Sequence, residues 1–291
     1  MSGQPRDDGG APPRVWPTLL ALATVPVFVF AAMVIAFVLR GFALGFESGD
    51  STQMNPGMIG LAVLVSSTAF AAGGLALAWL SPEPFRARLR LRWPPPRYAI
   101  LFVLATPVIG ALSALVDGVL FPEPTAYMQE LLELLRTTHG ADAVVLFVAM
   151  IVVAPIGEEL FFRGYVQTRL ERRLPIVVAI LVPAMVFTLI HLEVQHMVGV
   201  IPFALWAGYV VWHTQSLLVV VLSHAYNNAL SVVGARFSPP DAEVGLDDPT
   251  LIPMLILAGV SLVPFVLALR LPRVESAISA DSGDVFRPLP L

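Results

Sequence analysis

Long apolar stretches separated by short polar segments run along almost the whole chain. A helix needs about 20 mostly apolar residues to cross the hydrocarbon core of a bilayer, and eight stretches approach or exceed that length. They are residues 17–39, 57–80, 98–121, 143–162, 174–192, 197–212, 217–233 and 251–269. The pattern therefore predicts an all-α fold, a polytopic membrane bundle of about eight transmembrane helices.

Short polar segments flank and connect these stretches. Residues 1–14 and 275–291 predict disordered tails on either side of a single transmembrane helical domain, 15–274. Within this domain the polar residues of chemical interest fall in a motif-bearing core, 143–234. Residues 124–137 predict either a short interfacial helix or an ordinary polar connector.

The first stretch has an alternative interpretation as a cleaved signal peptide. Its apolar run is longer than the about 7–15 residues of a signal-peptide core, and no convincing small-residue cleavage site precedes Arg40. We therefore interpret it as a membrane span.

Arginine sets the predicted orientation, because the chain contains no lysine. With the N-terminus in the cytoplasm, all arginines except Arg40, Arg136 and Arg236 lie in cytoplasmic segments. This bias agrees with the positive-inside rule and with an even number of spans, so both termini are predicted to be cytoplasmic. The arginine run at 86–92 is interpreted as a topology determinant, with an anionic-lipid site as the alternative.

Composition agrees with a protein that lies mostly in lipid. Hydrophobic residues make up 57% of the chain and charged residues 13%, and the mean hydropathy is +0.79. These values argue against a soluble enzyme, a disordered chain and a nucleic-acid partner. The absence of cysteine excludes disulfides, thiol catalysis and thiolate metal sites. We expect a multi-pass protein of the cell membrane whose partners include membrane lipids.

Two adjacent acids lie near the end of the fourth apolar stretch. Charges at membrane depth cost about 2.5–3.5 kcal/mol each on insertion scales, so they need partners or a function. Glu159 and Arg163 are four residues apart and share a helix face, with the acid first, which is the favourable order. Glu158 points about 100° away and lacks that partner. Pro155, one turn earlier, removes a helix hydrogen bond beside this pair.

The fifth stretch contains Phe187 one turn before His191, so the ring can pack on the imidazole. If the chain reverses near residue 174, Glu158 and His191 both lie about 24–25 Å from the turn, at 1.5 Å per residue. Straight, continuous helices would then bring the two residues to one depth. The seventh stretch adds His224 and Asn228, which share a helix face and can both donate hydrogen bonds.

The three patterns E-E-x-x-x-R, F-x-x-x-H and H-x-x-x-N occur in this order on separate apolar segments. Together they resemble the signature of the CAAX protease and bacteriocin-processing (CPBP or Abi) family, which includes the type II CAAX prenyl endopeptidases. The resemblance covers about residues 143–234, and no motif position departs from it. It implies an intramembrane endopeptidase that acts on a membrane-embedded or lipidated peptide or protein.

The resemblance also implies three pairs of roles at one site: a water-activating pair, an oxyanion-stabilising pair and a supporting ion pair. In that order they are Glu158 with His191, His224 with Asn228, and Glu159 with Arg163. A buried carboxylate is a stronger base than an exposed one, and imidazole can hold water or protonate a leaving amine.

The resemblance leaves open whether the reaction needs a metal. In one version Glu158, His191 and His224 hold Zn²⁺ with one position left for water, and in the other glutamate acts without a metal. Zinc ligands are normally closely spaced, whereas 33 residues separate each of these from the next, which favours the version without a cofactor.

Other protease motifs fail on spacing or composition. His191 and His196 are five residues apart rather than the four of a zincin helix. Gly259-Val-Ser261 lacks the closing glycine of a serine-nucleophile motif. Asp117 is the only aspartate within an apolar stretch, whereas an aspartyl protease needs two.

Two alternatives to proteolysis stay open. One is a proton-coupled transporter in which Glu158, His191 and His224 form a relay, and the other is a non-catalytic membrane scaffold or immunity factor. The sequence does not predict the substrate, the cleavage site or the oligomeric state.

Overall fold

A computed structural model of the protein describes residues 17–24, 31, 34–35, 55–81, 84–237 and 251–275, and the statements below concern these residues. Within these ranges the regular elements are helices, and no strand occurs. In chain order they are α2 (Pro56–Trp79), α3 (Phe85–Arg88), α4 (Pro96–Leu120), α5 (Ala126–Thr137), α6 (Gly140–Val148), α7 (Ala154–Glu159), α8 (Thr168–Leu170), α9 (Ile176–Leu189), α10 (Val194–Thr214), α11 (Leu217–Phe237) and α12 (Leu251–Arg270). Two π-helical segments, η1 (Ala149–Val153) and η2 (Leu160–Gln167), join α6, α7 and α8 into one continuous helix.

Six helices in the described part of the chain are long and apolar enough to cross a membrane: α2, α4, the continuous helix Gly140–Leu170, α10, α11 and α12. The predicted all-α, polytopic fold is confirmed, whereas the predicted number of eight spans is not. The predicted span at 174–192 is too long, because α9 has only 14 residues and ends at Leu189. Of the predicted span 17–39, residues 17–24 are helical and most of the remainder lies outside the described residues.

Some predictions cannot be compared with the structure. Residues 1–14 and 276–291, predicted as tails, lie outside the described residues. The cytoplasmic placement of the termini stays a prediction. The connector 124–137 does form a helix, α5, whose first turn is capped by Thr125 through its hydroxyl and the backbone N–H of Met128.

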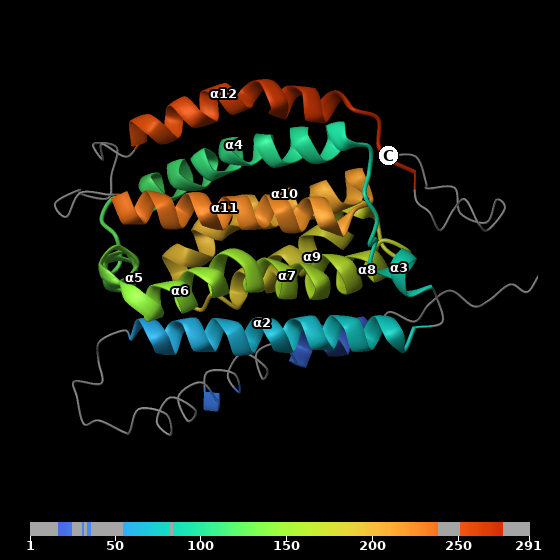
Figure 1. Ribbon diagram of the computed structural model, residues 1–291. Coiled ribbons are helices and arrows are strands. Elements are labelled where there is room, and N and C mark those ends of the chain that lie inside the picture. The colour runs from blue at the N-terminus through green and yellow to red at the C-terminus, as the bar shows by residue number, and fades with distance from the viewer. Residues whose placement is uncertain are drawn as a thin grey trace, which may run out of the picture.

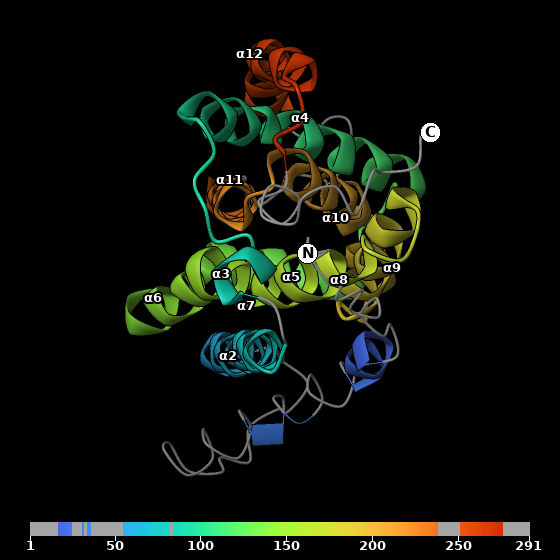
Figure 2. The same ribbon diagram turned by 90° about the vertical axis from the view of Figure 1, so that its right-hand side faces the viewer.

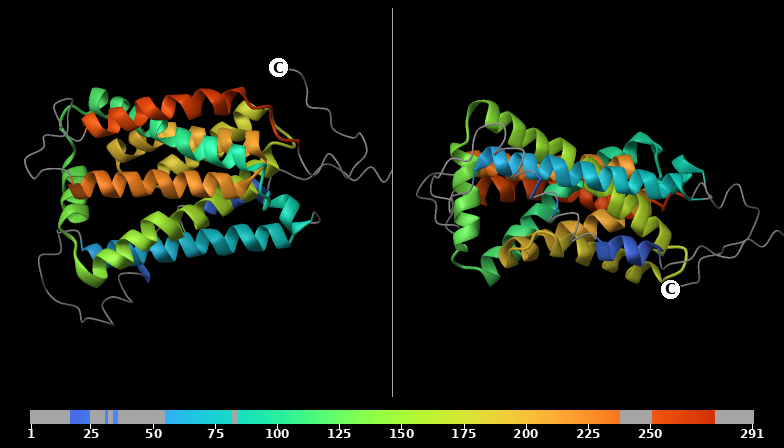
Figure 3. Two further views of the ribbon diagram at one scale, coloured as in Figure 1. Left: turned by 45° about the horizontal axis from the view of Figure 1, so that its top comes forward. Right: turned by 90° about the horizontal axis from the view of Figure 1, so that it is seen from below.

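The long helices lie side by side in layers (Figure 1). From one side of the bundle to the other the order is α2, the continuous helix of α6–α8, a layer of α10 and α11, then α4, and finally α12 (Figures 1 and 2). Figure 3 shows α5 lying across one end of the bundle and α3 at the opposite end. Because residues 86–97, 169–173 and 270–273 also gather at the α3 end, we call it the arginine-rich end.

Close backbone packing places the acid-bearing helix against α2. A Cβ atom at Gly157 would lie 2.0 Å from the carbonyl oxygen of Ser67, and one at Gly74 would lie 2.9 Å from the carbonyl oxygen of Leu160. Only glycine permits these approaches. The contact fixes α7, and with it the residue that follows Gly157, at the centre of the bundle.

Candidate active site

The two adjacent acids on α7 have different environments. Glu159 is fully buried, whereas the side chain of Glu158 is 15% exposed. Oε1 of Glu159 accepts a hydrogen bond from Nη1 of Arg163 at 3.1 Å. The ion pair predicted from the four-residue spacing is therefore present, and no arginine is paired with Glu158 in the described part of the chain.

Arg163 is buried between three elements. Its second terminal nitrogen, Nη2, donates to the backbone carbonyl of Ala204 on α10 at 3.0 Å. Its Cζ atom lies 4.5 Å from the centre of the Phe187 ring on α9. A buried guanidinium needs both charge neutralisation and hydrogen-bond acceptors, and these contacts supply them. The sequence predicted the carboxylate partner but not the carbonyl or the ring.

His224 connects both acids. Its Nδ1 lies 2.8 Å from Oε1 of Glu159, and its Nε2 lies 3.9 Å from Oε2 of Glu158. Because a carboxylate held by an arginine acts as an acceptor, Nδ1 donates to Glu159, and Nε2 is left facing Glu158. The ring is packed on Phe203, with 4.8 Å between ring centres. At 3.9 Å, Nε2 and Glu158 are too far apart for a direct hydrogen bond.

Asn228 on α11 donates a hydrogen bond to a backbone carbonyl of the acid-bearing helix that has no partner within that helix. Its Nδ2 donates to the carbonyl of Met150 at 2.8 Å. In the π-helical segment η1 the N–H of Ala154 bonds to Ala149, so Met150 would need the N–H of residue 155. Residue 155 is proline and has none. Pro155 thus removes a backbone hydrogen bond from this helix, as the sequence indicated. Asn228 on α11 donates to the carbonyl of Met150 in its place.

His191 lies in the turn after α9, not on the helix as the sequence predicted. Its Nδ1 lies 3.0 Å from the carbonyl of Phe187, one of the carbonyls that the end of α9 leaves free. A carbonyl only accepts, so Nδ1 carries the proton, and in the neutral ring Nε2 is the basic nitrogen. The predicted packing of Phe187 on His191 is present, with 5.2 Å between ring centres.

Phe187 lies between the three motifs. Its ring contacts Arg163 of the first motif, His191 of its own motif and, at 5.9 Å between ring centres, His224 of the third. Among the described residues no hydrogen bond or ion pair joins Glu158 directly to His191. Their predicted meeting at one depth assumed a continuous fifth helix, and that assumption fails at the end of α9. Phe187 and His224 provide the connection instead.

Two ring contacts of the site were not predicted from the sequence. Phe203 packs on His224, and His196 lies edge-on to His191 with 4.6 Å between ring centres. The five-residue spacing of His191 and His196 does not suit a zincin helix. The two residues lie close together because a turn, and not a continuous helix, connects them. The left-handed backbone of Leu192, with φ 59°, allows the turn that brings the two imidazoles together.

The donor set predicted for zinc does not fit a metal ion in this conformation. In the part of the chain that the structure describes, no three His, Asp or Glu side chains are grouped closely enough to hold one. His224 directs its two ring nitrogens at Glu159 and toward Glu158. Zinc needs three protein ligands around one point with a fourth position open for water.

Comparison with known proteins adds a family match for this region. Residues 140–230 match the family model described as type II CAAX prenyl endopeptidase Rce1-like. This range contains all three motifs, so the resemblance predicted from them is confirmed. No curated protein and no solved structure matches the chain.

Proposed function

Because the motif-bearing core of the chain is similar to the Rce1-like type II CAAX prenyl endopeptidases, we propose that this multi-pass membrane protein is an intramembrane endopeptidase. One observation supports this most directly. Two neighbouring carboxylates approach one buried imidazole, and only Glu159 is neutralised by an arginine. A carboxylate without a cationic partner in an apolar helical bundle is costly, which is consistent with a chemical role for Glu158.

In the proposed reaction Glu158 takes a proton from a water molecule, and the oxygen of that water attacks the carbonyl carbon of the substrate. Glu158 is partly exposed, so water can reach it, whereas Glu159 is sealed from solvent. The protonated Glu158 then delivers the proton to the leaving amine as the C–N bond breaks. His191, whose ring is held by the hydrogen bond from Nδ1 to the carbonyl of Phe187, assists this proton transfer through Nε2.

Two groups on α11 stabilise the tetrahedral oxyanion. His224 is held by Glu159 through Nδ1, and in its protonated form Nε2 donates toward the space beside Glu158. Asn228 uses one amide hydrogen for the carbonyl of Met150 and retains a second one. Donors that are already oriented before the charge develops are the most effective ones.

We propose the glutamate version of this chemistry, with water activated by Glu158. The carboxylate and imidazole groups of the described chain do not converge as a metal site. The pairing of Arg163 with Glu159 alone supports a structural role for Glu159 and a reacting role for Glu158. The proposed substrate is a membrane-embedded or lipidated peptide, since both acids and His224 lie on helices that are long and apolar enough to cross a membrane.

A cleavage assay with the purified protein in nanodiscs tests this proposal. Farnesylated CAAX peptides and the same peptides without the lipid are incubated with the parent, and products are identified by mass spectrometry. We expect one defined peptide bond to be cut and Glu158→Gln to abolish cutting. Glu133→Gln, in the exposed part of α5, is the matched control and should retain activity. Equal cutting by Glu158→Gln, or proton flux without cutting, would contradict the proposal.

A further inference from the structure

Residues 84–95, which we call the α3 segment, lie at the arginine-rich end of the bundle (Figure 1). Leu89 of this segment is fully buried and reaches the acid-bearing helix, where a Cβ at Gly164 would lie 3.1 Å from its Cδ2 atom. The next residue, Arg90, is only 8% exposed and has a φ of 51°. This left-handed conformation suits glycine and is uncommon for arginine, which indicates that the side chain has a use.

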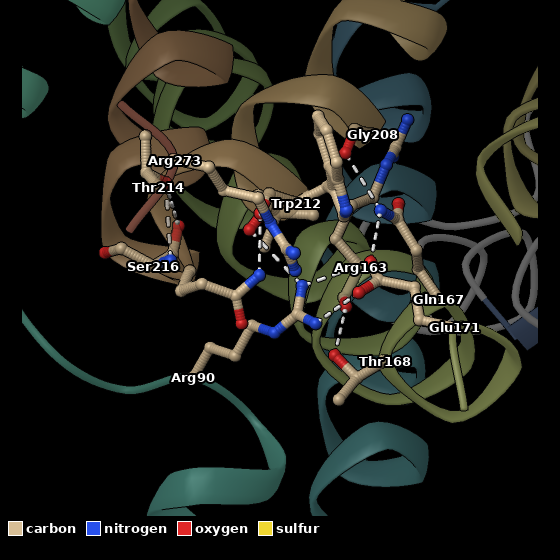
Figure 4. Close-up of polar contacts among 12 residues, drawn as sticks. Arg90, Arg163, Gln167, Thr168, Glu171, Gly208, Trp212, Thr214, Ser216 and Arg273 are labelled. Carbon is tan, nitrogen blue, oxygen red and sulfur yellow. Dashed lines mark hydrogen bonds and ion pairs between the residues drawn. The ribbon is translucent and has the colours of Figure 1, made fainter. Parts of the chain in front are cut away.

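The Arg90 guanidinium joins two of the helices that carry the site. It binds both carboxylate oxygens of Glu171, just beyond α8, with 3.1 Å between Nη1 and Oε1. Nη1 also donates to the carbonyl of Val211 on α10 at 3.2 Å. Figure 4 shows Gln167 beside this pair, where its amide donates to Glu171 at 2.9 Å and to the carbonyl of Gly208 at 2.8 Å.

These contacts continue a polar stripe that begins at the site. Glu159, Arg163, Gln167 and Glu171 recur every four residues along one helix. Their hydrogen bonds reach successive carbonyls of α10, first Ala204 from Arg163 and then Gly208 from Gln167. The stripe holds the acid-bearing helix in one register against α10.

The backbone of the α3 segment also holds the start of α11. The carbonyl of Arg90 accepts the N–H of Leu217, the first residue of α11, at 3.1 Å. The carbonyl of Arg92 accepts the hydroxyl of Ser216 at 2.6 Å. The first N–H groups of a helix lack partners within it, so the segment acts as a cap. Seven residues further along α11 is His224.

Helix α11 is therefore tied to the acid-bearing helix by side-chain hydrogen bonds and by the α3 segment. The side-chain bonds join His224 to Glu159 and Asn228 to Met150. Near the start of α11 the connection is Arg90, through its carbonyl on Leu217 and its guanidinium on Glu171. We propose that Arg90 is a positioning residue of the active site, which fixes where His224 lies relative to Glu158. This role rests on the proposed peptidase function and goes beyond it, because Arg90 lies outside all three motifs.

Enzyme kinetics provide the first test. Arg90→Gly removes the guanidinium and suits the left-handed backbone, so the variant should fold. Small misplacements of catalytic groups cost up to about 100-fold in rate, and we expect kcat to fall about 10- to 100-fold with KM nearly unchanged. Arg90→Glu combined with Glu171→Arg should recover part of the loss. Arg86→Ala, an exposed change in the same segment, is the matched control and should behave like the parent.

A distance measurement tests the role without relying on catalysis. The chain has no cysteine, so two introduced cysteines are the only sites that a spin label modifies. Suitable positions are Ile156→Cys on α7 and Leu222→Cys on α11, which are both exposed. We expect a narrow distance distribution in the parent and a broader or shifted one with Arg90→Gly or Glu171→Gln. That change supports the positioning role even if the parent cuts no peptide. An unchanged distribution with unchanged kcat overturns it even if the parent is an active peptidase.

Discussion

Glu159 and His224, which lie 65 residues apart in the chain, share a hydrogen bond of 2.8 Å at the centre of the bundle. Arg163 neutralises the same carboxylate through the same oxygen, Oε1. Glu159 is thereby held by two side chains, whereas no arginine is paired with Glu158 next to it among the described residues. The two acids should accordingly respond differently to the same isosteric substitution.

Glu159→Gln should mainly reduce stability. It leaves Arg163 buried without its counter-charge and gives His224 a neutral amide oxygen in place of a carboxylate as its acceptor, and breaking a buried ion pair typically costs about 3–5 kcal/mol. Thermal unfolding in detergent, followed by tryptophan fluorescence, measures the effect. Glu158→Gln is the matched control, with a melting temperature near that of the parent and no activity. Equal melting temperatures for both variants would contradict the division of roles.

Arg163→Ala should reduce both the yield of folded protein and the turnover of what remains. It strands Glu159 in a low-dielectric setting and leaves the carbonyl of Ala204 and the ring of Phe187 without their cation. Arg163→Lys keeps the charge but not the fork that reaches two acceptors, so its yield should be intermediate. Yield and turnover near those of the parent would exclude the supporting role assigned to Arg163.

Much of the fold was predictable because membrane helices are specified by apolar length. The contact between Glu159 and Arg163 and the packing of Phe187 on His191 were also predictable, since both depend on four-residue spacing alone. The position at which α9 ends was not predictable from the sequence. The apolar stretch continues beyond Leu189, and the helix stops where His191 turns back to the carbonyl of Phe187. Apolar length alone does not report such a local change in hydrogen bonding at a helix end.

The hydrophobic pattern also did not predict the π-helical segments or the burial of two arginines of the run at 86–92. Pro155 signalled a missing hydrogen bond, but not that Met150 would be the acceptor or Asn228 the donor. The run at 86–92 was interpreted as a topology determinant, yet Arg88 and Arg90 are buried. Charge counts along a chain report which side of the membrane a segment occupies, and they do not report that it folds back into the bundle.

Asn228→Ala should destabilise the protein by about 1 kcal/mol, because it leaves the partly buried carbonyl of Met150 without its donor. A second substitution separates this structural effect from catalysis. Pro155→Ala supplies an N–H that can reach the carbonyl of Met150, so the double variant should regain melting temperature. If Asn228 also stabilises the oxyanion, the double variant should stay less active than the parent. Recovery of full activity would assign Asn228 a structural role alone.

Metal removal should leave activity unchanged. After treatment with a zinc chelator, the parent should retain its kcat/KM, and elemental analysis should show less than one zinc per chain. The physical reason is that no three carboxylate or imidazole side chains of the described chain are grouped closely enough to hold a metal ion. Stoichiometric zinc, with activity lost on chelation and restored by the metal, would instead require His191, His224 and Glu158 to converge during turnover.

Gly157→Ala should be among the most damaging single-methyl additions in the described chain. The new Cβ would lie 2.0 Å from the carbonyl oxygen of Ser67, a backbone atom that can move only with α2 itself. Overpacking of this kind typically costs about 1–3 kcal/mol, and the shift displaces Glu158, so activity should fall as well. Gly118→Ala, on α4, is the matched control: nothing lies within 4 Å of its added methyl group, and the change should be neutral or slightly stabilising. Melting temperatures and cleavage rates of the two variants in the same nanodiscs give the comparison. If both variants matched the parent, the backbone contact between α2 and α7 would not be what holds Glu158 in place.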